Sequence, residues 1–537
     1  MNNKKALILI IILSFTFPQD IADIDYFYNS NFSQPFITFD AINNTAYYLN
    51  EYHPLILTDF KILDVNINAS SLAPMGTYCM NNFYQQFVYD SVSSNSFEHN
   101  RGDYAYYENT ILMSGKNDNI STLLMAQGRS QPVYDISDSE VNKGNTLQNY
   151  FLNINKFYPF SDKNHFYFSV STMYHMEDIN IPGDFSDSYY SRISDSYMYG
   201  LTANLSLNKL GFDFSSSSQI LNGNHYLDSD LIFDESTDWL NFDATWDYNQ
   251  YFSILSSFQS KNNSIEWPAM FNKIDLYEGS IGGELSYKNV TAQLLFKSIN
   301  FTDNNNNNKL NFYLSYGLET LNLTFSASKK TQSFINRSLI NEENLENIYP
   351  INIFDIYSIN IRYENKGTMF YLEPYLISSH YFYIDYPSDS IINKDFSGLK
   401  GSFSFKNDYI ISRVDGAVYY SDDLLPLNSY SNYSILFSPI INQKRFRPFI
   451  GISGSYMDLN SFGLITPNAG AYSSYYEDSR TKKENLFSFE MGFIIKGFKL
   501  TYSMVNPFDE EILFTFDDRY DSIRSFSNLK INWQFLD

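Results

Sequence analysis

Apolar and polar residues alternate along most of this chain from about residue 195 onward. Tyr197, Leu201 and Leu205 share one face of an extended segment, while Thr202 and Asn204 share the other. A repeat of two residues is that of a β-strand whose two faces meet different surroundings. The same alternation recurs at 240–248, 310–318, 321–327, 357–363, 487–495, 498–504 and 528–537.

The connections between these segments also alternate, between tight turns and long polar loops. Residues 208–209 and 288–289 are tight turns, whereas 222–236, 261–278 and the asparagine tract 304–308 are predicted loops. Short periplasmic turns and long extracellular loops are typical of outer-membrane barrels. We therefore predict an all-β fold, a transmembrane antiparallel up-and-down β-barrel of about 22 strands, with about 16 as the lower bound. Weaker candidate strands lie upstream at 77–90, 103–116, 119–128, 145–157 and 164–175.

The N-terminal residues have the features of an export signal. Two lysines precede the apolar run 6–13, which is too short to span a bilayer. The predicted organisation is a signal peptide at 1–19, a periplasmic or lumenal segment at 20–75, and an outer-membrane barrel at 76–537. These features predict a protein of the bacterial cell outer membrane.

The composition of the chain excludes several other classes of protein and disfavours one class of partner. The chain has 47 Phe and 46 Tyr, yet its mean hydropathy is −0.31, which excludes a helical membrane protein. Cys79 is the single cysteine, so a disulfide framework is excluded. A net charge of −24 disfavours nucleic acid as a partner, because binding to phosphates needs a basic surface.

In these respects the chain resembles porin-like β-barrels of bacterial outer membranes, particularly those of Bacteroidetes-like bacteria. The hairpin at 147–175 and the last strand, which ends near Trp533 and Phe535, carry the resemblance. It implies outer-membrane lipid, lipopolysaccharide, the barrel-assembly machinery and small solutes as partners. TonB-dependent receptors have similar strand numbers, but a full plug domain is longer than the segment 20–75.

The two faces of the strands give the candidate site residues. Polar residues opposite the apolar series should line the lumen, and rings at the strand ends should form the interfacial girdles. The lumen candidates are Glu284, Lys288, Arg362, Glu364, Arg445, Arg447 and Lys499, and the girdle candidates are Tyr197, Trp246, Tyr248, Tyr363, Trp533 and Phe535.

No catalytic, cofactor-binding or metal-binding pattern is present in the sequence. The six histidines lack zinc-site spacing, and no G-x-S-x-G motif occurs. We expect no enzyme activity and no cofactor, apart from divalent cations bound loosely at acidic loops.

The predicted function is therefore a channel or uptake protein that passes small hydrophilic solutes by diffusion. The alternatives are a secreted or surface all-β binding or adhesion protein, and a plugged structural or hydrophobic-solute barrel.

Overall fold

The computed structural model describes the strands of this protein and most of its tight turns. The described residues are 37–40, 45–48, 95–102, 107–117, 119–131, 145–161, 164–182, 189–207, 210–227, 230–267, 270–301, 305–318, 321–335, 351–384, 390–420, 427–439, 446–459, 462–466, 471–475, 482–495, 497–508 and 525–535. The predicted signal peptide and the candidate strand 77–90 lie outside them.

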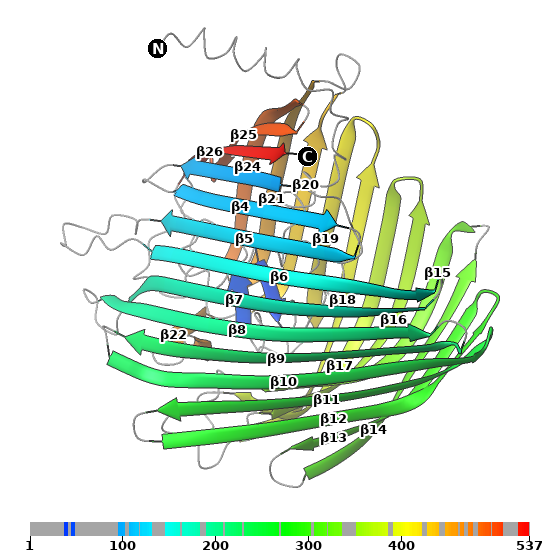
Figure 1. The fold of residues 1–537 in the computed structure, drawn as a ribbon. Helices are drawn as coiled ribbons and strands as arrows, with labels where there is room; N and C mark the ends of the chain where they lie inside the picture. The colour runs from blue at the N-terminus through cyan, green and yellow to red at the C-terminus, as the bar shows by residue number, and fades with distance from the viewer. Residues whose placement is uncertain are drawn as a thin grey trace, which may run out of the picture.

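Twenty-two antiparallel strands form one closed barrel, in which β26 pairs with β3 (Figure 1). The prediction of about 22 up-and-down strands is confirmed. The first eleven strands are β3 (Asn95–Gly102), β4 (Tyr107–Asn117), β5 (Ile120–Gln131), β6 (Asn145–Ser161), β7 (Asn164–Pro182), β8 (Tyr189–Leu207), β9 (Phe212–Leu227), β10 (Asp230–Asn249), β11 (Phe252–Trp267), β12 (Met270–Tyr287) and β13 (Val290–Phe301). The others are β14 (Asn305–Leu318), β15 (Leu323–Ile335), β16 (Ile351–Asn365), β17 (Thr368–Ile384), β18 (Ser390–Lys406), β19 (Ile410–Tyr420), β20 (Leu427–Phe437), β21 (Arg447–Leu459), β24 (Lys482–Ile495), β25 (Phe498–Val505) and β26 (Phe526–Phe535).

Asparagine side chains stabilise two of the tight turns. Asn249 Oδ1 accepts hydrogen bonds from the backbone N–H groups of Tyr251 and Phe252 at 2.8 and 3.0 Å. Asn407 Oδ1 does the same for Tyr409 and Ile410 at 2.8 and 2.7 Å. Short polar side chains that bond to the backbone two or three residues ahead favour turns, which explains the asparagines that mark these connections in the sequence.

Several predicted loops are strands instead. β9 and β10 pair as far as Leu227 and Asp230, so most of 222–236 belongs to a long hairpin, and β11 and β12 likewise span most of 261–278. Four asparagines of the tract, 305–308, pair with β13. A transmembrane strand needs only about 9–11 residues, and β10 has 20. In these strand extensions polar and apolar residues no longer alternate strictly, so the two-residue pattern that identifies strands is lost there.

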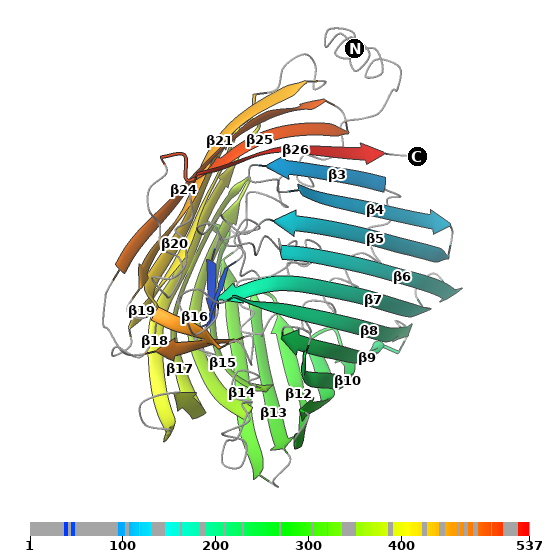
Figure 2. The ribbon, with the colours of Figure 1, turned by 90° about the vertical axis from the view of Figure 1, so that its left-hand side faces the viewer.

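Two short hairpins lie inside the barrel. The hairpin of β1 (Ile37–Asp40) and β2 (Thr45–Tyr48) falls within the barrel outline in both perpendicular views (Figures 1 and 2). β22 (Phe462–Thr466) and β23 (Ala471–Tyr475) form the second hairpin in the connection between β21 and β24. β23 contacts β2, so these two segments of the chain meet inside the wall.

Candidate functional site

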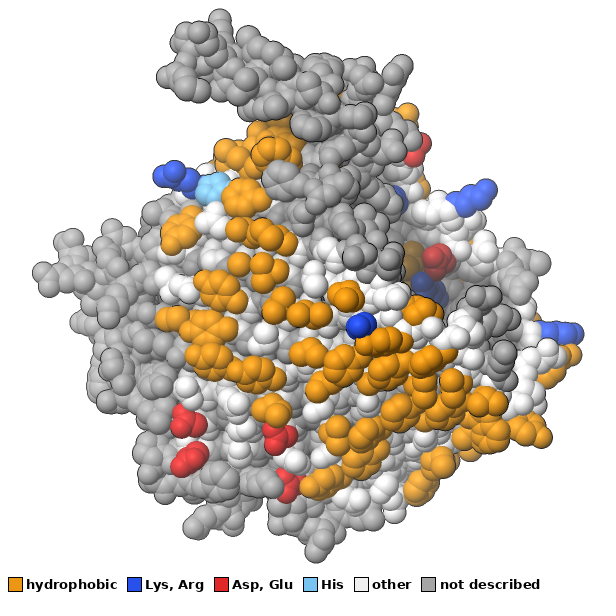
Figure 3. Space-filling view, viewed as in Figure 1, with side chains coloured by type: hydrophobic (Ala, Val, Ile, Leu, Met, Phe, Trp, Pro, Cys, Tyr) orange, Lys and Arg blue, Asp and Glu red, His pale blue; other side chains and the backbone are white. Residues whose placement is uncertain are grey.

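The outer surface of the barrel is apolar along the strands. Ile281, Leu285, Leu294 and Phe296 are all exposed, and they lie on the same face of β12 and β13. Rows of apolar side chains follow the strands of the face in view (Figure 3). Such a surface suits contact with lipid. Among the described residues, no helix is long and apolar enough to cross a membrane.

The positions that alternate with this apolar series are polar and face the lumen. On β6 and β7, Asn153 Nδ2 donates to Ser169 Oγ at 2.7 Å, and the Tyr167 hydroxyl donates to Asn155 Oδ1 at 2.6 Å. All four side chains are buried. Asn155 Nδ2 also donates to Ser121 Oγ on β5, at 3.1 Å. Buried polar groups need such partners, and here neighbouring strands supply them.

A charged cluster lies on the lumen side of the strands that close the barrel. We call it the closure cluster and define it as Glu98, Glu490, Lys499 and Lys530, from β3, β24, β25 and β26. Lys530 Nζ lies 3.0 Å from a Glu98 carboxylate oxygen. Glu490, Lys499 and Lys530 are buried. Buried charges of opposite sign offset part of each other's desolvation cost.

Another group of opposite charges lies on the lumen side of β17, β18 and β19. Arg413 Nε lies 3.0 Å from Asp415 Oδ1, and the Tyr371 hydroxyl donates to Glu373. Lys400 stands opposite Glu373 in the register of β17 and β18. Charges of both signs, interspersed with hydroxyls and amides, hydrate a lumen without giving it one strong sign.

Four of the predicted lumen residues lie near the tight turns. Gln293 and Ser286 both donate to Glu284. Arg362 Nη2 and Glu364 Oε2 lie 2.7 Å apart, and both side chains are exposed. Lys288 lies in the turn after β12 with a φ of 50°, and its Nζ is 5.3 Å from the centre of the Tyr287 ring. Whether these residues line a solute pathway stays a prediction.

The remaining lumen candidates have different surroundings. Arg447 is buried, and it donates to the Ser438 carbonyl, the Ser438 hydroxyl and the Asp408 carbonyl at 3.1, 2.7 and 2.9 Å. It therefore joins the turn after β18 to the end of β20. Lys499 belongs to the closure cluster, and Arg445 lies outside the described residues.

Five of the six girdle candidates lie toward strand ends. Trp246 and Tyr248 are exposed near the tight-turn end of β10, with ring centres 6.0 Å apart. Tyr197 is exposed but lies in the middle of β8, because this strand extends to Tyr189, so its predicted place at a strand end is wrong. Trp533 is exposed on β26. Tyr363 is half-buried on β16, and Phe535 is the last residue of β26. Their role at a membrane interface stays a prediction.

Sequence reasoning missed several charged residues of the wall. Glu98 and Glu490 were absent from the candidate set, although Glu490 alternates with the apolar residues Phe489 and Met491. Asp355 was also missed, and its signal is visible in the sequence. It is a carboxylate in phase with the apolar series that contains Tyr357 and Ile359.

Comparison with known proteins supports the architecture alone. No family model matches the chain, and no curated protein matches it. Among solved structures, the FrpB iron transporter from Neisseria meningitidis superposes with a TM-score of 0.64 at 10% identity, covering 84% of this chain and 83% of that one. The fold is that of the outer-membrane receptor barrels.

Two further solved structures have the same architecture. A mutant of the ferric enterobactin receptor PfeA from Pseudomonas aeruginosa has a TM-score of 0.62 at 8% identity, covering 82% of this chain and 80% of that one. The copper transporter OprC has a TM-score of 0.60 at 9% identity, covering 83% and 81%. The solved structures named here are transporters and receptors, so the likeness to porins stays a prediction. Among the described residues, no group of three or more His, Cys, Asp or Glu side chains is arranged to hold a metal ion.

Proposed function

We propose that this chain is an uptake barrel of a bacterial outer membrane that passes small hydrophilic solutes through its lumen. The observation that carries the proposal is the division of the closed wall into an exposed apolar outer face and a polar, ion-paired inner face. Export through residues 1–19, insertion by the barrel-assembly machinery and contact with lipopolysaccharide belong to the same proposal.

The two inner hairpins define how solutes pass. Barrels of about 22 strands are wide enough to need something in the lumen, and here β1–β2 and β22–β23 meet inside the wall. In our proposal these hairpins set the free cross-section, and solutes diffuse past them. Removing one hairpin should therefore widen the pathway.

Planar-bilayer conductance and liposome swelling test this proposal. The purified protein is expected to conduct small ions and to admit sugars, and a variant lacking residues 37–48 should conduct more. A matched variant shortened in the hairpin at 462–475 should also conduct more than the unchanged protein, because the two hairpins contact each other. A folded protein that shows no conductance in any of the three forms would refute diffusion through the lumen.

Uptake of metal complexes is the second candidate, and the fold likeness to FrpB, PfeA and OprC favours it. It predicts saturable binding of a ferric chelate or of copper to the purified barrel. Measurable binding without sugar permeability would support this candidate over diffusion.

A further inference from the structure

β14 and β15 part from each other halfway along their length. Their backbone pairing runs from Leu318 and Leu323 to Phe312 and Lys329. Beyond that point β14 remains paired only with β13, and β15 only with β16, each to its extracellular end. We call residues 305–311 and 330–335 the seam.

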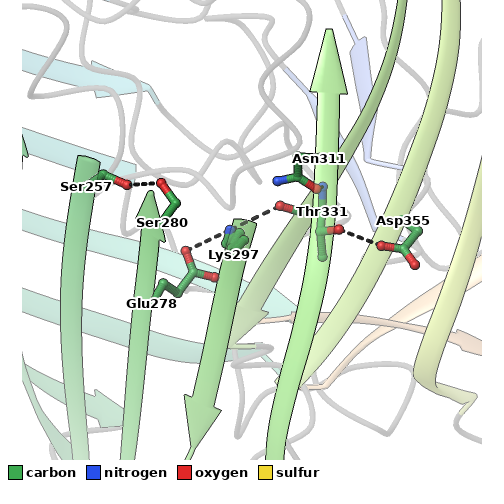
Figure 4. A network of polar contacts seen from close by, with 7 residues as sticks. All are labelled: Ser257, Glu278, Ser280, Lys297, Asn311, Thr331 and Asp355. Carbon is green, nitrogen blue, oxygen red and sulfur yellow. Dashed lines mark hydrogen bonds and ion pairs between the residues drawn. The ribbon is translucent and has the colours of Figure 1, made fainter. Parts of the chain in front are cut away.

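Side chains replace the backbone ladder at the seam (Figure 4). The Thr331 backbone N–H donates to Asn311 Oδ1 at 3.0 Å, and Lys297 Nζ donates to the Thr331 carbonyl at 3.0 Å. Lys297 is itself ion-paired with Glu278 at 3.0 Å. Backbone groups in a membrane wall need partners, so these side chains keep the wall sealed where the strands separate.

An ion pair at the seam joins opposite faces of the wall. Lys309 alternates with the exposed Leu310, so it belongs to the lumen-facing series of β14, whereas Asp355 is in phase with the exposed Tyr357 and belongs to the lipid-facing series of β16. Their Nζ and Oδ2 atoms nevertheless lie 3.0 Å apart. The inner side of β14 therefore overlaps the outer side of β15 and β16. We call this overlap the joint. Burial of Ile353, also in the lipid-facing series, agrees with such an overlap.

Among the side chains that the structure describes, Asn311, Lys297 and Lys309 make polar contacts across this joint. Thr331 Oγ1 donates to Asp355 Oδ1 at 2.6 Å and Lys329 Nζ lies 3.9 Å from Asp355 Oδ2, but these contacts stay within the paired strands β15 and β16 on one side of the joint. Separation of the two halves therefore breaks hydrogen bonds of Asn311 and Lys297 and one ion pair of Lys309, but no strand ladder.

We propose that the seam is a lateral portal through which anionic amphiphiles pass between the lumen and the outer leaflet. A carboxylate or phosphate group can replace Asp355 as the partner of Lys309, while Lys329 stays beside Asp355 on the other side of the joint, so the Lys309 ammonium group remains paired while the joint opens. The exposed Leu310 and Phe312 then contact the apolar chain of the solute. This route is separate from diffusion along the lumen.

The first test links the two sides of the seam covalently. In a Cys79→Ser background, Asn311→Cys and Thr331→Cys are joined by a short bifunctional thiol reagent that a reductant cleaves. Tyr313→Cys with Ser328→Cys is the matched control, because these residues stand opposite each other in the paired half of the same two strands. Folding of both variants is checked by the heat-dependent shift in gel mobility.

The readouts separate the portal from the proposed function. In cells that carry the protein, linking the seam should reduce transfer of fluorescent dodecyl phosphate into the outer membrane to the level of cells without it, and reductant should restore transfer. The control link should leave transfer unchanged, and sucrose permeation into liposomes should survive both links. Unchanged transfer across a linked seam overturns the portal, whereas absent sucrose permeation in the unlinked protein counts against the proposed function only.

The second test addresses recognition of the anion. Dodecyl phosphate carrying a photoreactive group should label residues 305–335, and Lys309→Gln should reduce that labelling. Lys366→Gln, in the turn between β16 and β17, is the control and should leave it unchanged. Equal labelling of all three proteins would overturn the assignment of an anionic head group.

Discussion

Loss of one partner from the ion pair of Lys530 and Glu98 should destabilise the barrel far more than loss of one partner from the pair of Arg362 and Glu364. The first pair is separated by 3.0 Å, and its side chains are 7% and 12% exposed. The second is separated by only 2.7 Å, but its side chains are 53% and 65% exposed. From distance alone, the pair of Arg362 and Glu364 would contribute more to stability. Burial reverses this order, because the pair of Lys530 and Glu98 is shielded from water.

The magnitudes follow from the surroundings of each pair. At 3.0 Å, Coulomb's law with an effective dielectric constant of about 20 gives an attraction of about 5 kcal/mol before desolvation is subtracted. Glu98→Gln leaves the Lys530 ammonium buried beside a neutral amide, a change that costs about 3–5 kcal/mol for buried pairs. Glu364→Gln removes an exposed pair, which contributes only about 0.2–1 kcal/mol.

Urea-dependent unfolding of the protein in lipid vesicles measures both changes, with gel mobility and tryptophan fluorescence as independent signals. The double variant Glu98→Gln with Lys530→Met should recover part of the loss, because it removes the buried ammonium group that has lost the Glu98 carboxylate. If Glu98→Gln and Glu364→Gln shift the free energy of unfolding equally, the claim that burial governs these pairs is refuted.

The same unfolding assay checks three further predictions. Gly367→Ala should destabilise the barrel by at least about 1–2 kcal/mol, because its φ is +88° and an added Cβ would collide with the Lys406 carbonyl oxygen. The control Gly128→Ala, whose added Cβ meets nothing within 4 Å, should have little effect, and equal losses for the two variants would contradict this explanation. Asn249→Ala removes both hydrogen bonds of the turn after β10 and should cost about 1 kcal/mol, so an unchanged midpoint would show that the turn forms without them. Arg447→Met leaves the Ser438 and Asp408 carbonyls without their charged donor and should cost about 2–4 kcal/mol, and a smaller loss than for Asn249→Ala would argue against a joining role for Arg447.

The barrel was predictable from the sequence because its wall has two unlike faces. Leu201 and Tyr197 are exposed on β8, and Ser206 in the alternate series is buried, as the period of two residues implies. Lipid on one side and a polar lumen on the other impose this pattern on every membrane-spanning segment. Local sequence therefore suffices to find most strands and their faces.

The strand ends and the seam were not predictable in this way. Residues 305–308 are all asparagine, and in 222–236 the apolar residues cluster instead of alternating, so the sequence favours loops even though backbone pairing continues. Parting of β14 from β15 depends on how three neighbouring strands overlap, and that is a property of register between segments. One sequence feature does indicate the seam. Asp355 is a charged residue in an apolar series, and it needs a partner from the other face of the wall.

The closure cluster and the seam contain similar side chains, but only the seam depends on them to hold the wall closed. Around the closure cluster, β25 pairs with β26 and β26 with β3 along their lengths, so the backbone ladder holds the wall whether or not the charges are paired. At the seam the ladder is interrupted, and Lys297, Lys309 and Asn311 make the contacts that close it. Neutralising a residue of the closure cluster should therefore lower stability while leaving the barrel closed. Neutralising Lys309 should favour opening, because no ladder remains at that level to hold the two halves together.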